Sequence, residues 1–198
     1  MNGVLDRGTG CFSDVTVPER EFSIRLGGKP GPETVECVNQ LKSVAVCRYC
    51  YVKLPVSFSS SDSFHIGPLF VQSKALGKNL SGCNEAYIFA ATIGSEADRL
   101  IARLGVSSPA RQFITDAAAS SLAEGLCDRV NALLVQKSCA ECRPRFSPGF
   151  GDFPLDYQPK LLRLTDATKQ IGVTLTNTLF LTPSKSVTAI IGVKTTWR

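Results

Sequence analysis

The residues from Ser108 to Lys137 constrain the fold of this chain more than any other stretch. Ser108 followed by Pro109 is a typical helix start, with a capping residue and then a proline in the first helical position. Apolar residues then recur at every fourth position, which places them along one face of a helix. They are Ile114, Ala118, Leu122, Leu126, Val130 and Leu134. The pattern predicts one long helix whose apolar stripe faces the core.

A buried strand is predicted immediately before this helical region. The segment YIFAATI at residues 87–93 is short, nearly all apolar and followed by Gly94. Ser95, with Asp98 three residues further on, matches a capping box and predicts a second helix with the body ADRLIARL. The order strand, helix, helix is therefore expected across the middle of the chain.

Weaker patterns predict the remaining elements. A short amphipathic helix is expected from Glu33, and the alternation of YVKLPV at residues 51–56 predicts a strand. Thr165 is expected to cap a short helix that ends at Gly172. Residues 173–193 read as two β-rich runs around a Thr-Pro-Ser-Lys turn, which predicts an antiparallel pair. Because strands and helices do not alternate strictly, the α+β class is favoured over a doubly wound sheet.

The length of 198 residues fits one domain. Residues 1–18 contain Gly, Ser, Thr and Asp without any period, and we expect a loose N-terminal extension followed by a domain over residues 19–198. The net charge is +5, but the basic residues are scattered, so no nucleic-acid-binding stripe is indicated. The longest apolar stretch is far short of the roughly 20 residues of a membrane span. The first residues lack the apolar core of a secretory signal, which predicts a cytoplasmic protein.

Eight cysteines suggest a second kind of chemistry. Two Cys-x-x-Cys pairs, Cys47 with Cys50 and Cys139 with Cys142, could supply four thiolates to a zinc ion or an iron–sulfur cluster. The pairs lie much further apart in the chain than the roughly 15–20 residues of compact zinc ribbons. We therefore expect free thiols, and a cysteine-ligated electron-transfer protein is the weaker alternative.

The segment CRPRFSPGFGDFPLDYQP at residues 142–159 is too rich in proline and glycine for a long helix or a central strand. Arg145 can fork onto a carboxylate with two parallel hydrogen bonds. Gly149 allows the backbone to approach a flat ligand closely, and Phe150 can cover an apolar or π face. This set suits an amino acid joined to a nucleoside, and a packed surface loop is the alternative.

The motif Arg145-x-x-x-Gly149-Phe150 resembles the Arg-x-x-x-Gly-Tyr motif of the activation domain of cobalamin-dependent methionine synthase, which binds S-adenosylmethionine in that family. The segments YIFAATIGSEADRLI, DAAASSLAEGLCDRVNALL and TNTLFLTPSKSVTAIIG are similar to segments of the family and follow in the same order. The resemblance covers roughly residues 85–193 and is strongest to short, stand-alone members. It implies a twisted, mainly antiparallel sheet flanked by helices.

The resemblance also implies roles for individual residues. Arg145 would pair with the carboxylate of S-adenosylmethionine, and Pro148 and Gly149 would offer backbone hydrogen bonds to the adenine. Glu124 matches a helix glutamate that contacts the ligand; by helical spacing it shares a polar face with Asp116, Ser120 and Asp128, for which a solvated face is the alternative. Phe150 replaces the family's tyrosine and lacks its hydroxyl. The family's histidine after the motif has no counterpart, because no histidine follows Phe150.

The function implied by the resemblance is reactivation, by reductive methylation, of a cobalamin-dependent methionine synthase or a related corrinoid methyltransferase. Cobalamin would be carried by the partner protein, and a flavodoxin-type or ferredoxin-type donor would supply an electron. The chain would then be an accessory component that makes no product alone. A non-catalytic binding module of the same fold is a further alternative.

Overall fold

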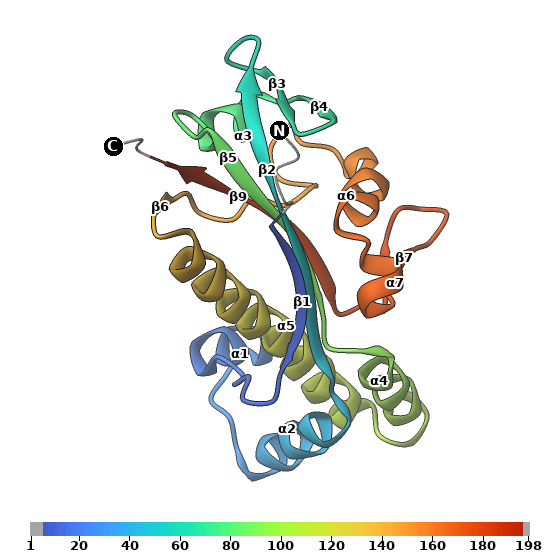
Figure 1. Cartoon of the computed structure of the whole chain (residues 1–198). Helices are drawn as coiled ribbons and strands as arrows, with labels where there is room; N and C mark the ends of the chain where they lie inside the picture. Colours follow the sequence, from blue (N-terminus) through green and yellow to red (C-terminus); the bar gives the residue numbers. More distant parts are fainter. Residues whose placement is uncertain (1–5, 196–198) are drawn as a thin grey trace.

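The structure, a computed structural model, describes residues 6–195 and is built on one antiparallel sheet (Figure 1). The sheet has the strand order β4-β3-β2-β5-β9-β6, and β1 pairs with the outer edge of β2. Its strands are β1 (Arg7–Phe12), β2 (Cys47–Phe58), β3 (Ser63–Ile66), β4 (Leu69–Gln72), β5 (Glu85–Thr92), β6 (Glu141–Cys142) and β9 (Ser186–Lys194). A separate ribbon pairs β7 (Thr174–Leu175) with β8 (Leu181–Thr182).

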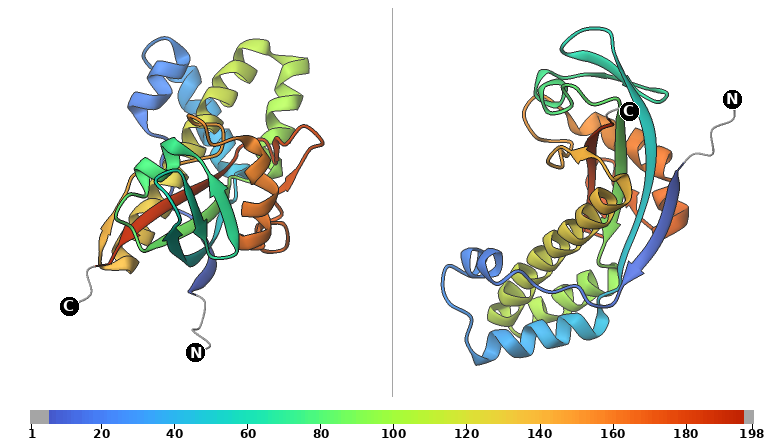
Figure 2. Two further views of the ribbon diagram at one scale, coloured as in Figure 1. Left: turned by 90° about the horizontal axis from the view of Figure 1, so that it is seen from above. Right: turned by 60° about the vertical axis from the view of Figure 1, so that its left-hand side comes forward.

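Helices cover both faces of this sheet. They are α1 (Glu19–Leu26), α2 (Pro32–Val44), α3 (Lys74–Asn79), α4 (Ser95–Ser107), α5 (Pro109–Ser138), α6 (Gln158–Thr165) and α7 (Ala167–Ile171), with a 3-10 turn at Leu155–Tyr157. The right-hand view of Figure 2 shows α1, α2 and α4 gathered around α5 at one end of the molecule, with the β3–β4 hairpin at the other end. In the described part of the chain, no helix combines the length and the apolar character needed to cross a membrane.

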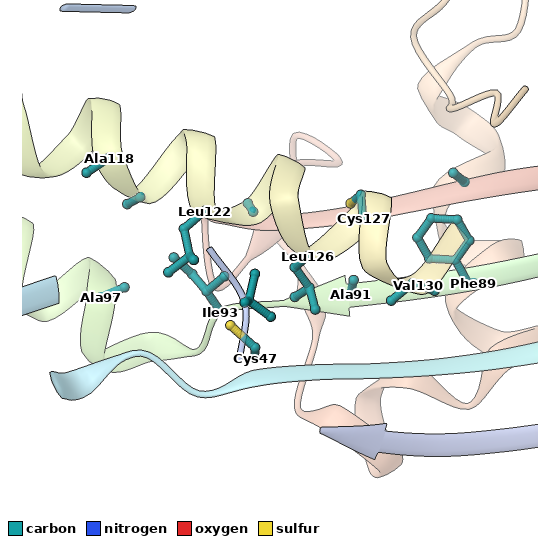
Figure 3. Packing of buried hydrophobic residues seen from close by; sticks show 14 of the residues in the cluster. Cys47, Phe89, Ala91, Ile93, Ala97, Ala118, Leu122, Leu126, Cys127 and Val130 are labelled. Atoms are coloured by element: carbon teal, nitrogen blue, oxygen red, sulfur yellow. The ribbon is translucent and has the colours of Figure 1, made fainter. Parts of the chain in front are cut away.

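The long helix α5 is confirmed, with Ser108 as its N-cap and Pro109 in its first turn. The predicted stripe is buried from Ala118 to Leu134, and Ile114 lies half-buried at its start. Figure 3 shows Leu122, Leu126 and Val130 pointing at the strands below. Each buried Leu or Val side chain contributes about 1.5–3 kcal/mol relative to an exposed one, so this stripe is a major source of stability.

The central strand β5 explains the uninterrupted apolar run that predicted it. Successive side chains of a strand point to opposite faces of the sheet. Tyr87 and Phe89 pack in the core beneath α5, whereas Ala86 and Ile88 pack in a second core on the other face. Because both faces are covered, no position in the middle of β5 is left for a polar residue. The predicted strand at residues 51–56 belongs to the longer β2, and the helix predicted from Glu33 is α2.

The expectation of a loose extension over residues 1–18 is wrong for residues 7–12, which form β1. The strand pairs with β2 from Arg7 opposite Val52 to Phe12 opposite Cys47. A Cβ atom at Gly8 or Gly10 would lie within 3 Å of a tyrosine ring carried by β2. The glycines that suggested a loop therefore leave room for these rings. Phe12 also stacks on Tyr49 with ring centroids 4.9 Å apart.

Two predicted helix starts differ from the structure. Gly94 is the N-cap of α4, and the Asp98 carboxylate accepts hydrogen bonds from the backbone N and the Oγ of Ser184, at 2.7 and 2.6 Å. Thr165 ends α6 instead of starting a helix, and its Oγ1 donates to the carbonyl of Leu161 at 2.9 Å. In both places a polar side chain that suits a cap is used for another hydrogen bond.

The predicted antiparallel pair at residues 173–193 is also wrong in its pairing. β8 pairs with β7, whereas β9 pairs with β5 on one edge and β6 on the other. Ala189, Ile190 and Ile191 are fully buried in β9. A strand that is apolar on both faces is stabilised more by a place inside the main sheet than by a local hairpin.

Candidate functional site

A cavity of about 340 Å³ lies between α5, the segment after β6, the start of α6 and the start of β9. Its volume is within the roughly 300–1,000 Å³ of small-molecule sites. Four of the predicted site residues line it, namely Glu124, Arg145, Pro148 and Phe150, and Gly149 lies between the last two in the chain. The other lining residues are Phe146, Ser147, Gln158, Leu181, Ser186, Val187 and Thr188.

The segment from β6 to Phe146 runs along the edge of β9. Arg143 N donates to the carbonyl of Gly192, and Phe146 and Ile190 exchange two backbone hydrogen bonds, all at 2.8 Å. The chain then turns: Phe150 N donates to Ser147 O, and Gly149, with φ of 93°, donates its N–H to Phe153 O at 2.7 Å. The positive φ explains the glycine. The amides of residues 149 and 150 are thus used inside the loop, so the expected backbone contacts of Gly149 with a ligand can come only from its carbonyl side.

The far side of the loop is anchored to the start of α3 by Asp152. Its carboxylate accepts hydrogen bonds from Ser73 Oγ at 2.6 Å and from the amides of Lys74 and Ala75 at 2.8 and 3.0 Å. The bond from Ser73, followed by those from the two amides, lowers the pKa of Asp152 to about 2. Gly151 has φ of 56°, and a Cβ there would lie 2.7 Å from the Cβ of Ala75. The loop therefore has a fixed shape.

The aromatic residues of this segment divide into anchors and a cavity wall. Phe153 is fully buried, and its ring centroid lies 4.8 Å from that of Tyr157. Phe146 is half-buried, and its ring meets Phe150 edge-on at 6.3 Å. Phe150 lines the cavity but remains 65% exposed. The rings of Phe153, Tyr157 and Phe146 anchor the loop, whereas the ring of Phe150 would become buried only if a bound molecule covered the cavity.

Arg145 is held between two carboxylates of α5. One guanidinium nitrogen lies 2.6 Å from Glu124 Oε2, and another is hydrogen-bonded to Asp128. Burial disfavours the charged form, but the hydrogen bond to Asp128 and the charges of both carboxylates outweigh it and raise the pKa of Arg145. The arginine side chain is 27% exposed. The site therefore combines a cationic fork with two carboxylates.

The polar face of α5 is engaged along its length. Lys185 lies 2.8 Å from Asp116 and 2.9 Å from Ser120 Oγ, which are about two turns and one turn of the helix before Glu124. Each of the four polar residues grouped by spacing thus has a partner on one of the two segments that border the cavity, while the side chains of Asp116 and Asp128 stay 50% and 65% exposed. The binding role of this face stays a prediction.

Three buried polar residues of the cavity were missed from the sequence: Gln158, Ser186 and Thr188. Thr188 Oγ1 donates to Gln158 Oε1 at 2.5 Å, and Ser186 Oγ donates to Pro183 O at 2.6 Å. Ser186 and Thr188 are two residues apart on β9, so their side chains lie on the same face of the sheet, but two hydroxyl residues at this spacing are only a weak sequence signal for a binding site. Gln158 carries no sequence signal, because its neighbours come from β9.

The structure does not bring the two Cys-x-x-Cys pairs together as a metal site. Within residues 6–195, no group of three or more His, Cys, Asp or Glu side chains could hold a metal ion. Cys47 packs in the core beneath α5 and Cys50 in a core on the other face, where burial raises the pKa of each thiol to about 11. Cys139 is exposed at the end of α5. The four-cysteine alternative is therefore wrong.

Comparison with known proteins supports the fold independently of these residues. No protein-family model and no curated protein matches the sequence. Among solved structures, the crystal structure of the MetH reactivation domain bound to AdoHcy superposes with a TM-score of 0.74 at 13% sequence identity. The match covers 98% of this chain and 81% of that chain. The α+β class and the activation-domain-like fold are thus confirmed: this chain has the fold of the MetH reactivation domain.

Proposed function

We propose that this chain binds S-adenosylmethionine, or its demethylated product AdoHcy (S-adenosylhomocysteine), in the cavity beside α5. One observation carries the proposal: Arg145 and Glu124 line the same cavity and lie in contact with each other. A guanidinium fork beside a carboxylate matches the two charges of a free amino acid. The α-carboxylate would accept two hydrogen bonds from Arg145, and the ammonium group would donate to Glu124.

The remaining walls suit the nucleoside half of such a ligand. Phe146, Pro148 and Phe150 offer apolar and aromatic surface next to the charged pair. A ligand base lying against Phe150 would cover a ring that is otherwise mostly exposed, and aromatic contacts of this kind stabilise a complex beyond the area that they bury. The phenylalanine provides this face without the hydroxyl of the related motif.

The role that follows is the reactivation of a cobalamin-dependent methionine synthase or a related corrinoid methyltransferase. S-adenosylmethionine would supply the methyl group, an electron donor of the flavodoxin or ferredoxin type would supply one electron, and the corrinoid would belong to the partner protein. The contribution of this chain is to bind and orient the methyl donor. We place the protein in the cytoplasm, where free thiols persist.

Calorimetry with S-adenosylmethionine and with AdoHcy tests the proposal on the wild type, Arg145→Ala and Arg143→Ala. Arg143 is the matched control: it lies two residues away, pairs with Glu141 and donates to Ser81 O, outside the cavity. We expect binding by the wild type and by Arg143→Ala, and loss of binding in Arg145→Ala. A folded wild type that binds neither compound, alone or with a corrinoid protein, would overturn the proposal and favour a non-catalytic module. Pull-down against corrinoid methyltransferases, with and without S-adenosylmethionine, would then identify the partner.

A further inference from the structure

The strand β1 leaves one edge of its backbone open. Lys53 N donates to Asp6 O at 2.7 Å, so every second residue from Asp6 onward directs its backbone groups toward β2. The residues between them, Arg7, Thr9 and Cys11, direct their N–H and C=O groups to the opposite edge. Within residues 6–195, none of these groups has a hydrogen-bond partner in the backbone. The right-hand view of Figure 2 shows β1 at the margin of the sheet.

This edge lacks the usual protection against pairing with another strand. Natural edge strands are very short, carry Lys or Pro, contain a bulge or are covered by a helix or loop. β1 is six residues long, has the sequence RGTGCF and pairs with β2 without a bulge. At the neighbouring α6–α7 junction, a cavity of about 220 Å³ lies between Asp166 and Gln170 on one side and Arg7 and Thr9 on the other. The backbone groups of β1 are therefore accessible to a further strand.

We propose that two copies of this chain associate through β1, which pairs antiparallel with β1 of the second copy about a two-fold axis at Thr9. Arg7 of each copy would then face Cys11 of the other, and Thr9 would face Thr9. In this register all three outward-directed residues of each copy exchange backbone hydrogen bonds. A two-fold axis at Gly8 or Gly10 would leave one of the three without a partner. The main sheets of the two copies would thus form one continuous sheet.

The side chains around β1 favour a second copy over an unrelated strand. Gly8 and Gly10 lie on the face of the sheet that carries α5, and the rings of Tyr51 and Tyr49 reach over them from β2. In the proposed register, Gly8 of one copy lies opposite Gly10 of the other, so the tyrosine rings of both copies meet over a floor without side chains. A larger side chain opposite Gly8 would collide with the hydroxyl end of Tyr51. On the other face, Thr9 packs against Thr9, which is a favourable pair across strands.

Two features of this interface make the association weak and dependent on salt. A single pair of strands is a small interface, which is typical of a reversible complex. Arg7 of one copy would lie about 10 Å, or two strand spacings, from Arg48 of the other, because Arg48 is the neighbour of Cys11 in β2. Salt screens charges at this distance, so the dimer should be more stable at physiological than at low salt.

Sedimentation equilibrium on the wild type, Thr9→Pro and Thr9→Val tests the association. Proline removes the outward N–H of residue 9 and leaves the hydrogen bonds between β1 and β2 in place, whereas valine keeps that N–H and removes only the hydroxyl. We expect a reversible dimer for the wild type and for Thr9→Val. In Thr9→Pro the dimer should be at least about tenfold weaker, because both hydrogen bonds at the two-fold axis are lost. Circular dichroism establishes that the variants are folded.

A disulfide cross-link tests the register without the proline variant. The background is Cys11→Ser with Cys139→Ser, which lacks the two exposed thiols. Thr9→Cys places two thiols at the axis, where the Cα atoms of a hydrogen-bonded pair lie about 5.5 Å apart, within the range of a disulfide. Arg7→Cys is the matched control, because its two thiols would lie about 14 Å apart along the paired strands. We expect oxidised glutathione to link two copies of Thr9→Cys much faster than two copies of Arg7→Cys.

Each contrary result overturns the proposal in a recognisable way. A wild type that stays monomeric up to about 1 mM at physiological salt would show that the edge of β1 does not pair with itself. A dimer of equal strength in Thr9→Pro, or one that cross-links no faster at position 9 than at position 7, would place the interface elsewhere. The calorimetric test of S-adenosylmethionine binding is independent of these outcomes, since β1 does not line the cavity beside α5.

Discussion

Both terminal nitrogens of Arg145 are engaged, one by Asp128 and the other by Glu124, so a ligand carboxylate that binds end-on to this pair of nitrogens competes with these partners. Glu124 lines the cavity and is positioned to accept the ligand's ammonium group, whereas Asp128 does not line it and its side chain is 65% exposed. The ligand should therefore displace Asp128. We predict that Asp128→Asn tightens the binding of AdoHcy and that Glu124→Gln weakens it.

The two magnitudes follow from the exposure of each pair. An ion pair with one partner as exposed as Asp128 contributes about 0.2–1 kcal/mol, so removing it should tighten binding by at most about fivefold. A hydrogen bond between charged groups contributes about 1.5–3 kcal/mol, so loss of the Glu124 contact should weaken binding by about 10-fold to 150-fold. Each substitution removes one negative charge from the same face of α5. Long-range electrostatics would therefore move both affinities in the same direction.

Calorimetry with AdoHcy at low and high salt separates these effects, and the helix signal in circular dichroism checks that α5 is intact. The gain in Asp128→Asn should shrink at high salt, because exposed pairs are screened. Weaker binding by Asp128→Asn would refute the displacement, since it would make Asp128 a partner of the ligand. Equal changes in both variants would show that only the total charge of the helix face matters.

Three further results are expected. Gly125→Ala should destabilise the fold in urea unfolding, because a Cβ atom there would overlap the carbonyl of Thr16, and the cost of overpacking, about 1–3 kcal/mol, exceeds the gain in helix propensity of about 1 kcal/mol. Gly105→Ala should stabilise the fold by about 0.5–1 kcal/mol, because its Cβ atom would meet only a flexible side chain. A change of the same sign in both variants would contradict the packing argument. The ionised Asp152 carboxylate stabilises the fold at any pH above the pKa that this group has in the unfolded chain, and the stabilisation is lost as the pH falls through about 2. The difference in thermal stability between the wild type and Asp152→Asn should therefore narrow from pH 4 to pH 2. A difference that does not change with pH would show that the carboxylate is not the source of the stabilisation. An alkylating reagent should modify the exposed thiols of the native protein quickly and the buried thiols only after unfolding, and mass spectrometry detects the modified residues. The exposed thiols are Cys11 and Cys139, and the buried thiols are Cys37, Cys47, Cys50, Cys83 and Cys127. Rapid modification of the buried thiols in native protein would contradict the core packing.

The sequence predicted well those elements in which burial in the core sets a local pattern of apolar residues. The α5 stripe repeats every four residues because one helix face is buried, and the β5 run is apolar because both faces are buried. β1 was missed because the glycines at positions 8 and 10 suit a loop equally well. Only the tyrosines of β2, some 40 positions later, show why these residues are small. Such a pairing has no local signature.

The same limit applies to the cysteines. In a strand, a spacing of three places Cys47 and Cys50 on opposite faces of the sheet, whereas in a turn the same spacing can bring two thiolates to one metal ion. The motif alone does not distinguish these cases. The distinction comes from β2, which extends four residues further toward the N-terminus than the predicted strand and so includes both cysteines.

The candidate site was predictable where its chemistry lies in a motif and unpredictable where it depends on tertiary placement. Arg145, Gly149 and Phe150 share one short segment, but the ion pair between Arg145 and Glu124 joins residues 21 positions apart. Gln158 shows the difference most clearly: in the sequence it is an ordinary helix residue, and it becomes a buried residue of the cavity, accepting a hydrogen bond from Thr188, only because α6 lies over β9. At 13% identity to the MetH reactivation domain, apolar alternation is enough to account for the shared fold, since many apolar residues can fill the same core. A buried polar side chain is not replaceable in that way, because its burial is costly unless its polar atoms are hydrogen-bonded. We therefore expect the proposed function to depend on a few polar groups around the cavity, and substitutions there to separate the fold from the site.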